Sequence, residues 1–341
     1  MGASRLVIGL VGTCYSSALF LSSVFLGRFA DVRGRREVLR VGFLLAAVAT
    51  LLQAFATDVL QLVFVRILLG LSAGIVPSVL IGYFLYETKG RIGIFASFGA
   101  LGWGFGSLMA GVFGDSRMIF VFAGGLMIFA CLAVWSLPIT SEVRHRIPLF
   151  PKEVFKQNSA VYVSVLVRHT GANIVWVTYP LFLIEELGAD KLWVGVIYTV
   201  NAITQFLVMR RLDRIRPATL VGAGIALSIL TFLLFSQVGT YYEIIPLQAV
   251  LALSWSSLYV GGLRYVNERS SEKSTSTGWL AGMISVAGIL GPAAGGYLND
   301  LIDYRMTMVS AAFMCVIALA IFLLFKDRDL EMEKADHGTG Q

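Results

Sequence analysis

The stretch Gly27-Arg-Phe-Ala-Asp31-Val-Arg-Gly34-Arg35-Arg36 lies between two long apolar segments and decides the fold of this 341-residue chain. Gly34 permits the backbone conformation that a tight turn needs. Asp31, at the end of a helix, is placed to pair with arginines or to face a helix N-terminus. Arg35 and Arg36 are suited to anchoring the turn at a membrane–water interface. The stretch therefore predicts a short basic turn between two membrane helices.

The composition places the whole chain in a membrane. Hydrophobic residues make up 57%, charged residues 14%, and the mean hydropathy is +0.78. A soluble globular chain carries about 25% charged residues, so this chain lacks the polar surface for soluble domains. Disorder, a disulfide-stapled secreted fold and a soluble nucleic-acid binder are excluded. Cys14, Cys131 and Cys315 each lie in an apolar run without metal-ligand spacing, and we expect them to be packing residues.

A membrane helix needs roughly 20 apolar residues, and eleven segments of the chain meet that requirement. Alternating polar and apolar residues, as in a membrane β-barrel, are not seen. The 35 glycines favour close helix packing in lipid. The predicted spans are Leu6–Leu26, Leu39–Thr57, Leu60–Tyr86, Ile92–Phe113, Ile119–Leu137, Ala160–Ile184, Leu192–Met209, Thr219–Val238, Ile244–Leu263, Gly278–Leu298 and Met306–Phe325.

The basic residues predict the orientation of these spans. Most of the 27 lysines and arginines lie in one alternate set of connections, which includes the C-terminal tail. By the positive-inside rule this set faces the cytoplasm. The net charge of +6 is thereby explained by topology, and we expect no nucleic-acid partner.

The quoted stretch resembles the loop signature of the major facilitator superfamily, G-x-x-x-D-x-x-G-R-[RK], which joins the second and third helices of that family. Arg66, Gly70 and Gly74 are similar to the R-x-x-x-G motif of the family's fourth helix, and their spacing places them on one helix face. The resemblance covers nearly the whole chain. It implies an all-α, polytopic membrane protein built from two pseudo-repeated helical bundles, five visible helices in the first and six in the second.

A second motif departs from the family pattern. Gly291, Pro292, Gly295 and Gly296 resemble the G-P-x-x-G-G pattern of drug/proton antiporters. Antiporters carry that pattern on the fifth family helix, whereas here it lies on the eleventh. We therefore expect these residues to form a Pro-kinked, small-residue packing face.

An internal repeat supports the two-bundle organisation. Residues 209–216 align with residues 27–34 when Asp213 is placed on Asp31. The first half lacks a counterpart of family helix one, which we expect to lie outside this sequence; the alternative is a true eleven-helix variant. The expected organisation is an N-terminal bundle over 1–138, a central cytoplasmic loop over 139–158, a C-terminal six-helix bundle over 159–326 and a cytoplasmic tail over 327–341.

Charged side chains inside spans are the first candidates for substrate contact, because a charge in lipid must face a partner or a wet cavity. Arg66 and Arg168 qualify, and the acidic residues all fall in loops or at segment ends. A cationic cavity favours an anionic or amphipathic substrate. A coupling proton would then need a carboxylate outside this sequence, or His169. In the family, helices one, four, seven and ten line the central cavity, which gives the candidate set Arg66, Arg168, His169, Asn173, Trp176, Trp255 and Tyr259.

These observations together predict a secondary transporter that moves a small solute by alternating access. The loop motif is expected to control the cytoplasmic gate, through Gly27, Asp31, Gly34, Arg35, Arg36, Glu87 and Asp213. The alternatives are a drug/proton antiporter and a non-transporting membrane receptor on the same bundle. An enzyme is disfavoured because nucleophile, phosphate-loop and metal motifs are missing from the connections. We expect no cofactor or metal, a small-molecule substrate with a coupling proton or ion, the lipid bilayer of the plasma membrane as surroundings, a monomer, and a cytoplasmic C-terminus.

Overall fold

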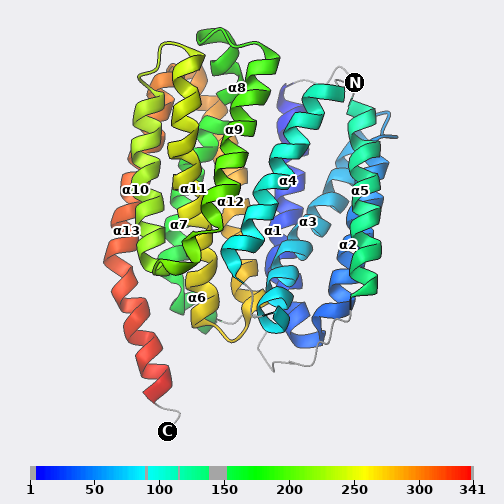
Figure 1. Cartoon of the computed structure of the whole chain (residues 1–341), viewed down its shortest axis with the longest axis vertical. Coiled ribbons are helices and arrows are strands. Elements are labelled where there is room, and N and C mark those ends of the chain that lie inside the picture. The colour runs from blue at the N-terminus through cyan, green and yellow to red at the C-terminus, as the bar shows by residue number, and fades with distance from the viewer. Residues whose placement is uncertain (1–4, 89–90, 114–115, 138–151, 339–341) are drawn as a thin grey trace. The chain divides into compact units, whose positions relative to one another are not determined.

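The protein is all-helical over the residues that the computed structural model describes, which are 5–88, 91–113, 116–137 and 152–338. The main helices run along the chain as Figure 1 shows. Their bounds are α1 Arg5–Arg33, α2 Arg35–Gln53, α3 Val59–Thr88, α4 Ile92–Phe113, α5 Ser116–Ser136, α6 Lys152–Gln157, α7 Ser159–Trp176, α8 Tyr179–Leu181, α9 Lys191–Met209, α10 Pro217–Phe235, α11 Tyr241–Arg269, α12 Lys273–Leu301 and α13 Tyr304–Gly338. A π-helix, η1 (Phe182–Glu186), follows α8, and a 3-10 turn, η2 (Leu212–Arg214), joins α9 to α10.

Eight helices within the described ranges are long and apolar enough to cross a membrane, and the bent pair formed by α7 with α8 and η1 raises that number to nine. The helices α1 and α2 cover the first two predicted spans and are not in that set. The all-α polytopic fold expected from the sequence is confirmed.

One predicted span is broken rather than continuous. The segment 160–184 contains a bend of 40° between α7, which ends at Trp176, and the short elements that follow. Pro180 explains the break, because its ring nitrogen has no hydrogen to donate to the carbonyl four residues earlier. The π-helix then closes with the Leu187 backbone N–H donating to Phe182 O at 3.2 Å.

The chain folds as two compact units, each of which combines helices from both halves of the sequence. Unit 1 consists of residues 1–90, 112–154 and 270–289, and therefore holds α1, α2, α3, α5 and the first part of α12. Unit 2 consists of residues 91–111, 155–269 and 290–341, and holds α4, most of the C-terminal helices and the end of α12. These units differ from the two bundles expected over 1–138 and 159–326. The bundles follow from the sequence repeat, whereas the units group residues that pack together.

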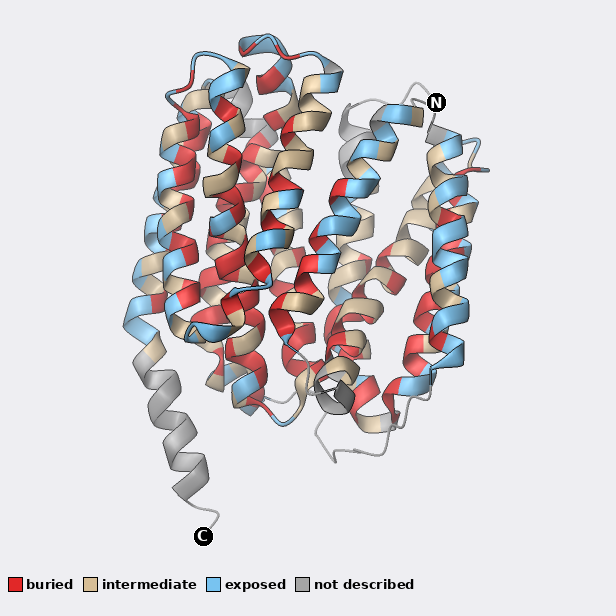
Figure 2. Ribbon diagram, in the orientation of Figure 1, coloured by how far each residue is buried: buried red, intermediate tan, exposed pale blue. Residues whose placement is uncertain are grey.

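Each unit has its own buried interior (Figure 2). In unit 1, α1 and α2 pack on α3, and α2 packs on α5, around a core that includes Leu39, Phe43 and Val79. In unit 2, α7, α10, α11 and α13 pack together around buried rings such as Phe232 and Phe322.

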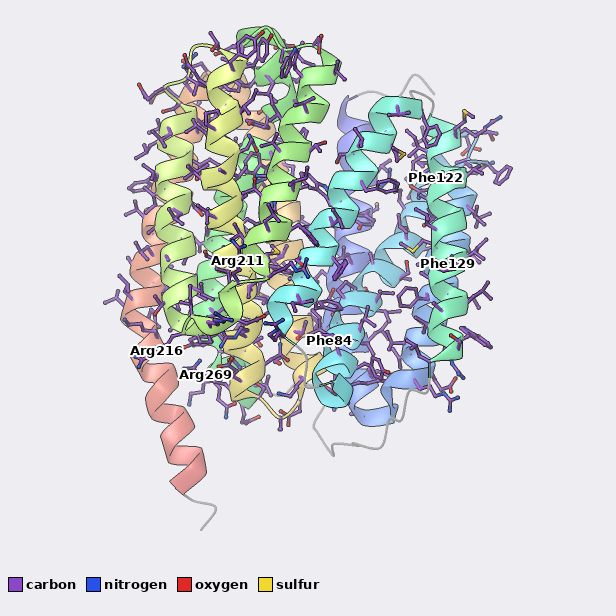
Figure 3. All side chains as sticks on the ribbon, in the orientation of Figure 1. Phe84, Phe122, Phe129, Arg211, Arg216 and Arg269 are labelled. Atoms are coloured by element: carbon purple, nitrogen blue, oxygen red, sulfur yellow. The ribbon has the colours of Figure 1, made fainter. Side chains whose placement is uncertain are left out.

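The outward helix faces carry large apolar side chains. Phe122 and Phe129 project from α5 in Figure 3, and Phe129 is 72% exposed. Exposed apolar side chains over a whole helix face suit contact with lipid tails rather than with water. The helix faces thus agree with a membrane protein.

Candidate functional site

Asp31 joins the end of α1 to the beginning of α12 inside unit 1. Its carboxylate is fully buried, and Oδ2 accepts hydrogen bonds from the backbone nitrogen of Thr275 at 2.8 Å and from its Oγ1 at 2.9 Å. Thr275 is the third residue of α12, so its N–H has no partner within its own helix. The negative charge also complements the positive end of the helix dipole. Asp31 therefore acts as a cap supplied from another helix.

Arg35 completes this contact. Its NH2 group pairs with Asp31 Oδ1, and its Nε donates to Ser274 Oγ at 3.0 Å. Both side chains of the ion pair are buried. We name the contact of Asp31 and Arg35 with Ser274 and Thr275 the first latch.

Three glycines make the first latch possible. Gly34 has φ of 113°, a conformation that side-chain-bearing residues rarely adopt, and it sets the turn from α1 into α2. A Cβ on Gly27 would lie 2.8 Å from Ser274 O, and one on Gly278 would lie 2.1 Å from Ser23 O. Glycine at these positions lets α1 and α12 approach closely.

The other residues expected at this gate have different surroundings. Arg36 is exposed beside the turn, as an interface anchor would be. Glu87 lies in the last turn of α3, and its side chain is outside the described part of the chain.

Asp213 makes the corresponding contact in unit 2. Its Oδ1 accepts a hydrogen bond from the backbone nitrogen of Gly93 at 2.9 Å. Gly93 is the second residue of α4, so this N–H also lacks a partner within its helix. The approach is tight, because a Cβ on Gly93 would lie 2.1 Å from Met209 O. We name the Asp213–Gly93 contact the second latch.

The two latches differ in their number of bonds. Asp213 Oδ2 is buried and has no hydrogen-bond partner among the described residues. Arg264, the basic residue that binds the same turn, donates instead to the backbone carbonyls of Leu212 and Ile215 and pairs with Glu268. Within the described ranges, the second latch therefore has no counterpart of the buried ion pair in the first.

Gly70 and Gly74 lie on the face of α3 that packs against α1. A Cβ on Gly70 would lie 2.4 Å from Tyr15 O, and one on Gly74 would lie 1.9 Å from Ser22 Oγ. Arg66 is one turn away, half-buried, and its Nε is buried without a hydrogen-bond partner in the described ranges. The R-x-x-x-G motif thus combines a close contact between α3 and α1 with an arginine whose Nε has no hydrogen-bond partner among the described residues.

Arg168 is the most buried charged side chain among the described residues of unit 2, with 1% exposure. Its Nε donates to Ser228 Oγ at 2.8 Å, and its NH2 group donates to Ser254 Oγ at 3.4 Å. Both serine hydroxyls also bond to Gly224 O. Among the residues that the structure describes, Arg168 has no carboxylate within ion-pair distance. The hydrogen-bond partners of the guanidinium in the described part of the chain are therefore neutral groups.

Aromatic rings border Arg168 on one side. Its guanidinium carbon lies 5.7 Å from the centroid of the Trp255 ring, within cation–π range. The His169 and Trp255 centroids are 5.1 Å apart at 31°, and those of Trp255 and Tyr259 are 5.1 Å apart at 17°. We name Arg168, His169, Trp255 and Tyr259 the arginine cluster.

The remaining predicted cavity residues lie beside this cluster or away from it. Asn173 Nδ2 donates to His169 O at 2.9 Å and so stays next to the arginine cluster. Trp176 instead belongs to a separate group of rings, at 5.2 Å from Tyr179 and 5.7 Å from Phe232. Of the seven cavity candidates, the structure thus brings together five.

The glycine-proline motif on α12 packs against α7. A Cβ on Gly291 would lie 2.3 Å from Asn173 Cβ, and one on Gly295 would lie 2.6 Å from Ile174 O. Pro292 lies within the helix between them, whereas the surroundings of Gly296 are outside the description.

Sequence reasoning missed a chain of buried amides in unit 2. Gln248 Nε2 donates to Tyr179 OH at 2.8 Å, Asn201 Nδ2 donates to the Gln248 backbone oxygen at 3.2 Å, and Gln205 bonds to Asn201. Ser228 was missed as well. All are uncharged polar residues inside apolar spans, and a search for charges alone passes over them.

Metal ligation has no support within the described residues, where no group of three or more His, Cys, Asp or Glu side chains is gathered. The thiols of Cys14, Cys131 and Cys315 are free.

Comparison with known proteins gives consistent results along the whole chain. The family model described as Major Facilitator Superfamily matches residues 1–165 and again residues 161–340. Multidrug resistance protein 2 of Bacillus subtilis is 21% identical over 96% of this chain and 88% of its own length. Quinolone resistance protein NorA of Staphylococcus aureus is 22% identical over 88% of this chain and 83% of its own.

A solved structure is also similar. The human organic anion transporter MFSD10 (TETRAN) superposes with a TM-score of 0.78, covers 92% of this chain and 83% of its own, and is 16% identical. At that identity the likeness concerns the fold.

Proposed function

Because the chain belongs to the Major Facilitator Superfamily, we propose that it is a secondary active transporter that carries a small anionic or amphipathic solute across the plasma membrane by alternating access. The family transports small molecules and does not catalyse reactions. The anionic or amphipathic substrate, the alternating-access mechanism and the plasma membrane are what the proposal adds to the family membership.

The observation that carries the anionic substrate is the burial of Arg168 with no carboxylate partner among the described residues. A guanidinium in a membrane-spanning helix is costly, by about 2.5–3.5 kcal/mol at the helix centre even on the most lenient scale. Two serine hydroxyls and a histidine offset part of that cost. An anionic substrate would supply the missing negative charge.

The two latches support the alternating-access part of the proposal. We propose that residues 1–138 and 159–326 form the two repeated bundles, and that Asp31 and Asp213 hold the cytoplasmic end closed by capping helices of the opposite bundle. Breaking such caps is a discrete event, as a two-state gate requires.

The basic loops support the orientation. The turn between α9 and α10 exposes arginines at its surface, of which Arg211 and Arg216 are labelled in Figure 3. We propose that this end and the C-terminus face the cytoplasm, and that the protein acts as a monomer.

The direct test of the substrate charge is uptake into proteoliposomes of two aromatic probes, the anion 2-naphthoate and the cation ethidium. The proposal expects wild-type protein to carry 2-naphthoate, and Arg168→Met to lose at least about 90% of that activity. Arg168→Met should still fold, because an apolar side chain of similar volume replaces a charge without an ionic partner. Transport of ethidium alone would contradict an anionic substrate.

Drug/proton antiport is a second candidate, since the matched bacterial relatives are named for multidrug and quinolone resistance. It predicts that a proton gradient across the vesicle membrane drives ethidium in the direction opposite to the proton flow. The same two-probe assay decides between the candidates.

A further inference from the structure

We propose that His169 is the residue that contacts the substrate, that Arg168 acts through it, and that the ligand is an aromatic carboxylate. This inference rests on the transport function proposed above and specifies the substrate class of that site.

The hydrogen bond between the two side chains fixes the tautomer of His169. Arg168 NH1 lies 3.3 Å from His169 Nδ1. A guanidinium has five donors and no acceptor, so Nδ1 must accept. An imidazole whose Nδ1 accepts is neutral and carries its proton on Nε2. His169 therefore has an N–H donor at Nε2, which has no hydrogen-bond partner among the described residues.

Burial decides which of the two residues a ligand meets. Arg168 is 1% exposed, and its Nε and NH2 groups are engaged by Ser228 and Ser254. His169 is only half-buried. A ligand therefore reaches His169 first, while the positive charge lies one hydrogen bond behind the ring. That arrangement polarises the Nε2–H toward an acceptor and stabilises negative charge beside it.

The rings next to His169 point to an aromatic ligand. Trp255 and Tyr259 stack nearly parallel at 17° and both remain half-buried, so part of their surface is accessible. Offset stacking on such rings favours an aromatic ligand beyond the burial of its apolar area. An aromatic carboxylate can thus accept a hydrogen bond from His169 Nε2, offset the charge of Arg168 and stack on the Trp255 and Tyr259 rings.

Asn173 contacts the turn of α7 that carries His169. Its Nδ2 bonds to the backbone oxygen of His169, while the α12 backbone approaches Asn173 through Gly291. The turn of α7 that carries His169 is thereby fixed from two sides.

The test compares three substitutions of His169 for binding of 2-naphthoate, measured with purified protein in detergent. His169→Gln keeps an amide N–H near the position of Nε2. His169→Asn places its amide near Nδ1 instead, and His169→Phe keeps the ring without a donor. We expect His169→Gln to bind within about threefold of wild type, and the other two to lose roughly 10- to 100-fold, as for a hydrogen bond to a charged group.

The second measurement reads the tautomer and is independent of any ligand. The chain has three histidines, so His145→Gln with His337→Gln leaves His169 as the source of the ¹⁵N-histidine ring signals, one from Nδ1 and one from Nε2. We expect the Nε2–H tautomer in that background, and a mixture of tautomers once Arg168→Met is added. A merely structural role for Arg168 would leave the tautomer unchanged.

The outcomes separate this inference from the proposed function. If wild type carries ethidium but not 2-naphthoate, the proposed anionic substrate is wrong. If wild type binds 2-naphthoate and His169→Asn or His169→Phe binds it equally well, His169 is not the contact and the inference alone is overturned. An Nδ1–H signal in the His145→Gln, His337→Gln background would also overturn it.

Discussion

Asp213 accepts a hydrogen bond from the backbone nitrogen of Gly93 at 2.9 Å, and in doing so caps α4 as Asp31 caps α12. The sequence repeat aligned the two aspartates without indicating their partners. In each unit a carboxylate from one half of the sequence meets the N-terminus of a helix from the other half. The two repeats thus share an aspartate that accepts a hydrogen bond from a helix N-terminus, in addition to their helices.

The first prediction is that each latch controls its own helix. Ser276 on α12 and Ser97 on α4 are fully buried, so a cysteine at either position reports on opening. In a background with the three native cysteines replaced, Asp31→Asn should increase thiol labelling at Ser276→Cys, and Asp213→Asn should increase labelling at Ser97→Cys. Each aspartate variant serves as the control for the other reporter. Equal labelling at both positions in both variants would mean that the latches do not act separately.

The second prediction concerns the unequal strength of the latches. Asp31→Asn removes the charge from a buried ion pair with Arg35, for which losses of about 3–5 kcal/mol are typical. Asp213→Asn removes only a favourable charge at a helix end, worth about 0.3–1 kcal/mol and up to 2 in buried settings. Thermal unfolding in detergent should therefore show a clearly larger loss for Asp31→Asn. A larger loss for Asp213→Asn would contradict the assignment.

The third prediction addresses the turn at Gly34. Its φ of 113° is costly for any residue with a Cβ, so Gly34→Ala should lower stability by about 1–2 kcal/mol. Gly12, which is helical with nothing within 4 Å of an added Cβ, is the matched control. Gly12→Ala should be neutral or stabilising by up to about 1 kcal/mol. The stabilities of the two variants are compared by thermal unfolding. Equal losses for Gly34→Ala and Gly12→Ala would contradict the claim that the positive φ of Gly34 requires glycine.

The fourth prediction tests the packing of α12 on α7. A Cβ on Gly291 would lie 2.3 Å from Asn173 Cβ, so Gly291→Ala should destabilise the protein by about 1–3 kcal/mol through overpacking. Gly195 on α9 has open space around it and provides the control. If Gly195→Ala proves as damaging as Gly291→Ala, the close approach of the two helices is not what stabilises this region.

Much of the fold was predictable because its signals are local. Apolar runs mark the helices, and the stretch around Asp31 and Gly34 indicated the family, which the family model confirms. The helix break after Trp176 was missed, since an apolar run conceals a proline that membrane helices often tolerate.

The partners at the site were less predictable, because they are distant in sequence. Thr275 is 244 residues from Asp31, and a helix N-terminus as a ligand leaves no side-chain motif. Arg168 was identified by its charge, whereas Ser228, 60 residues away, is one neutral hydroxyl within an apolar helix. Pairings of this kind depend on the packing of helices and not on local pattern.

The measurement that tests the central claim most directly is counterflow of 2-naphthoate in proteoliposomes. Vesicles are loaded with unlabelled 2-naphthoate and diluted into a trace of the labelled anion, with no ion gradient. A carrier that alternates access to one anion site predicts transient accumulation of label above its equilibrium level, and loss of this overshoot in Arg168→Met. An overshoot with ethidium and none with 2-naphthoate, or an overshoot unchanged in Arg168→Met, would contradict the account.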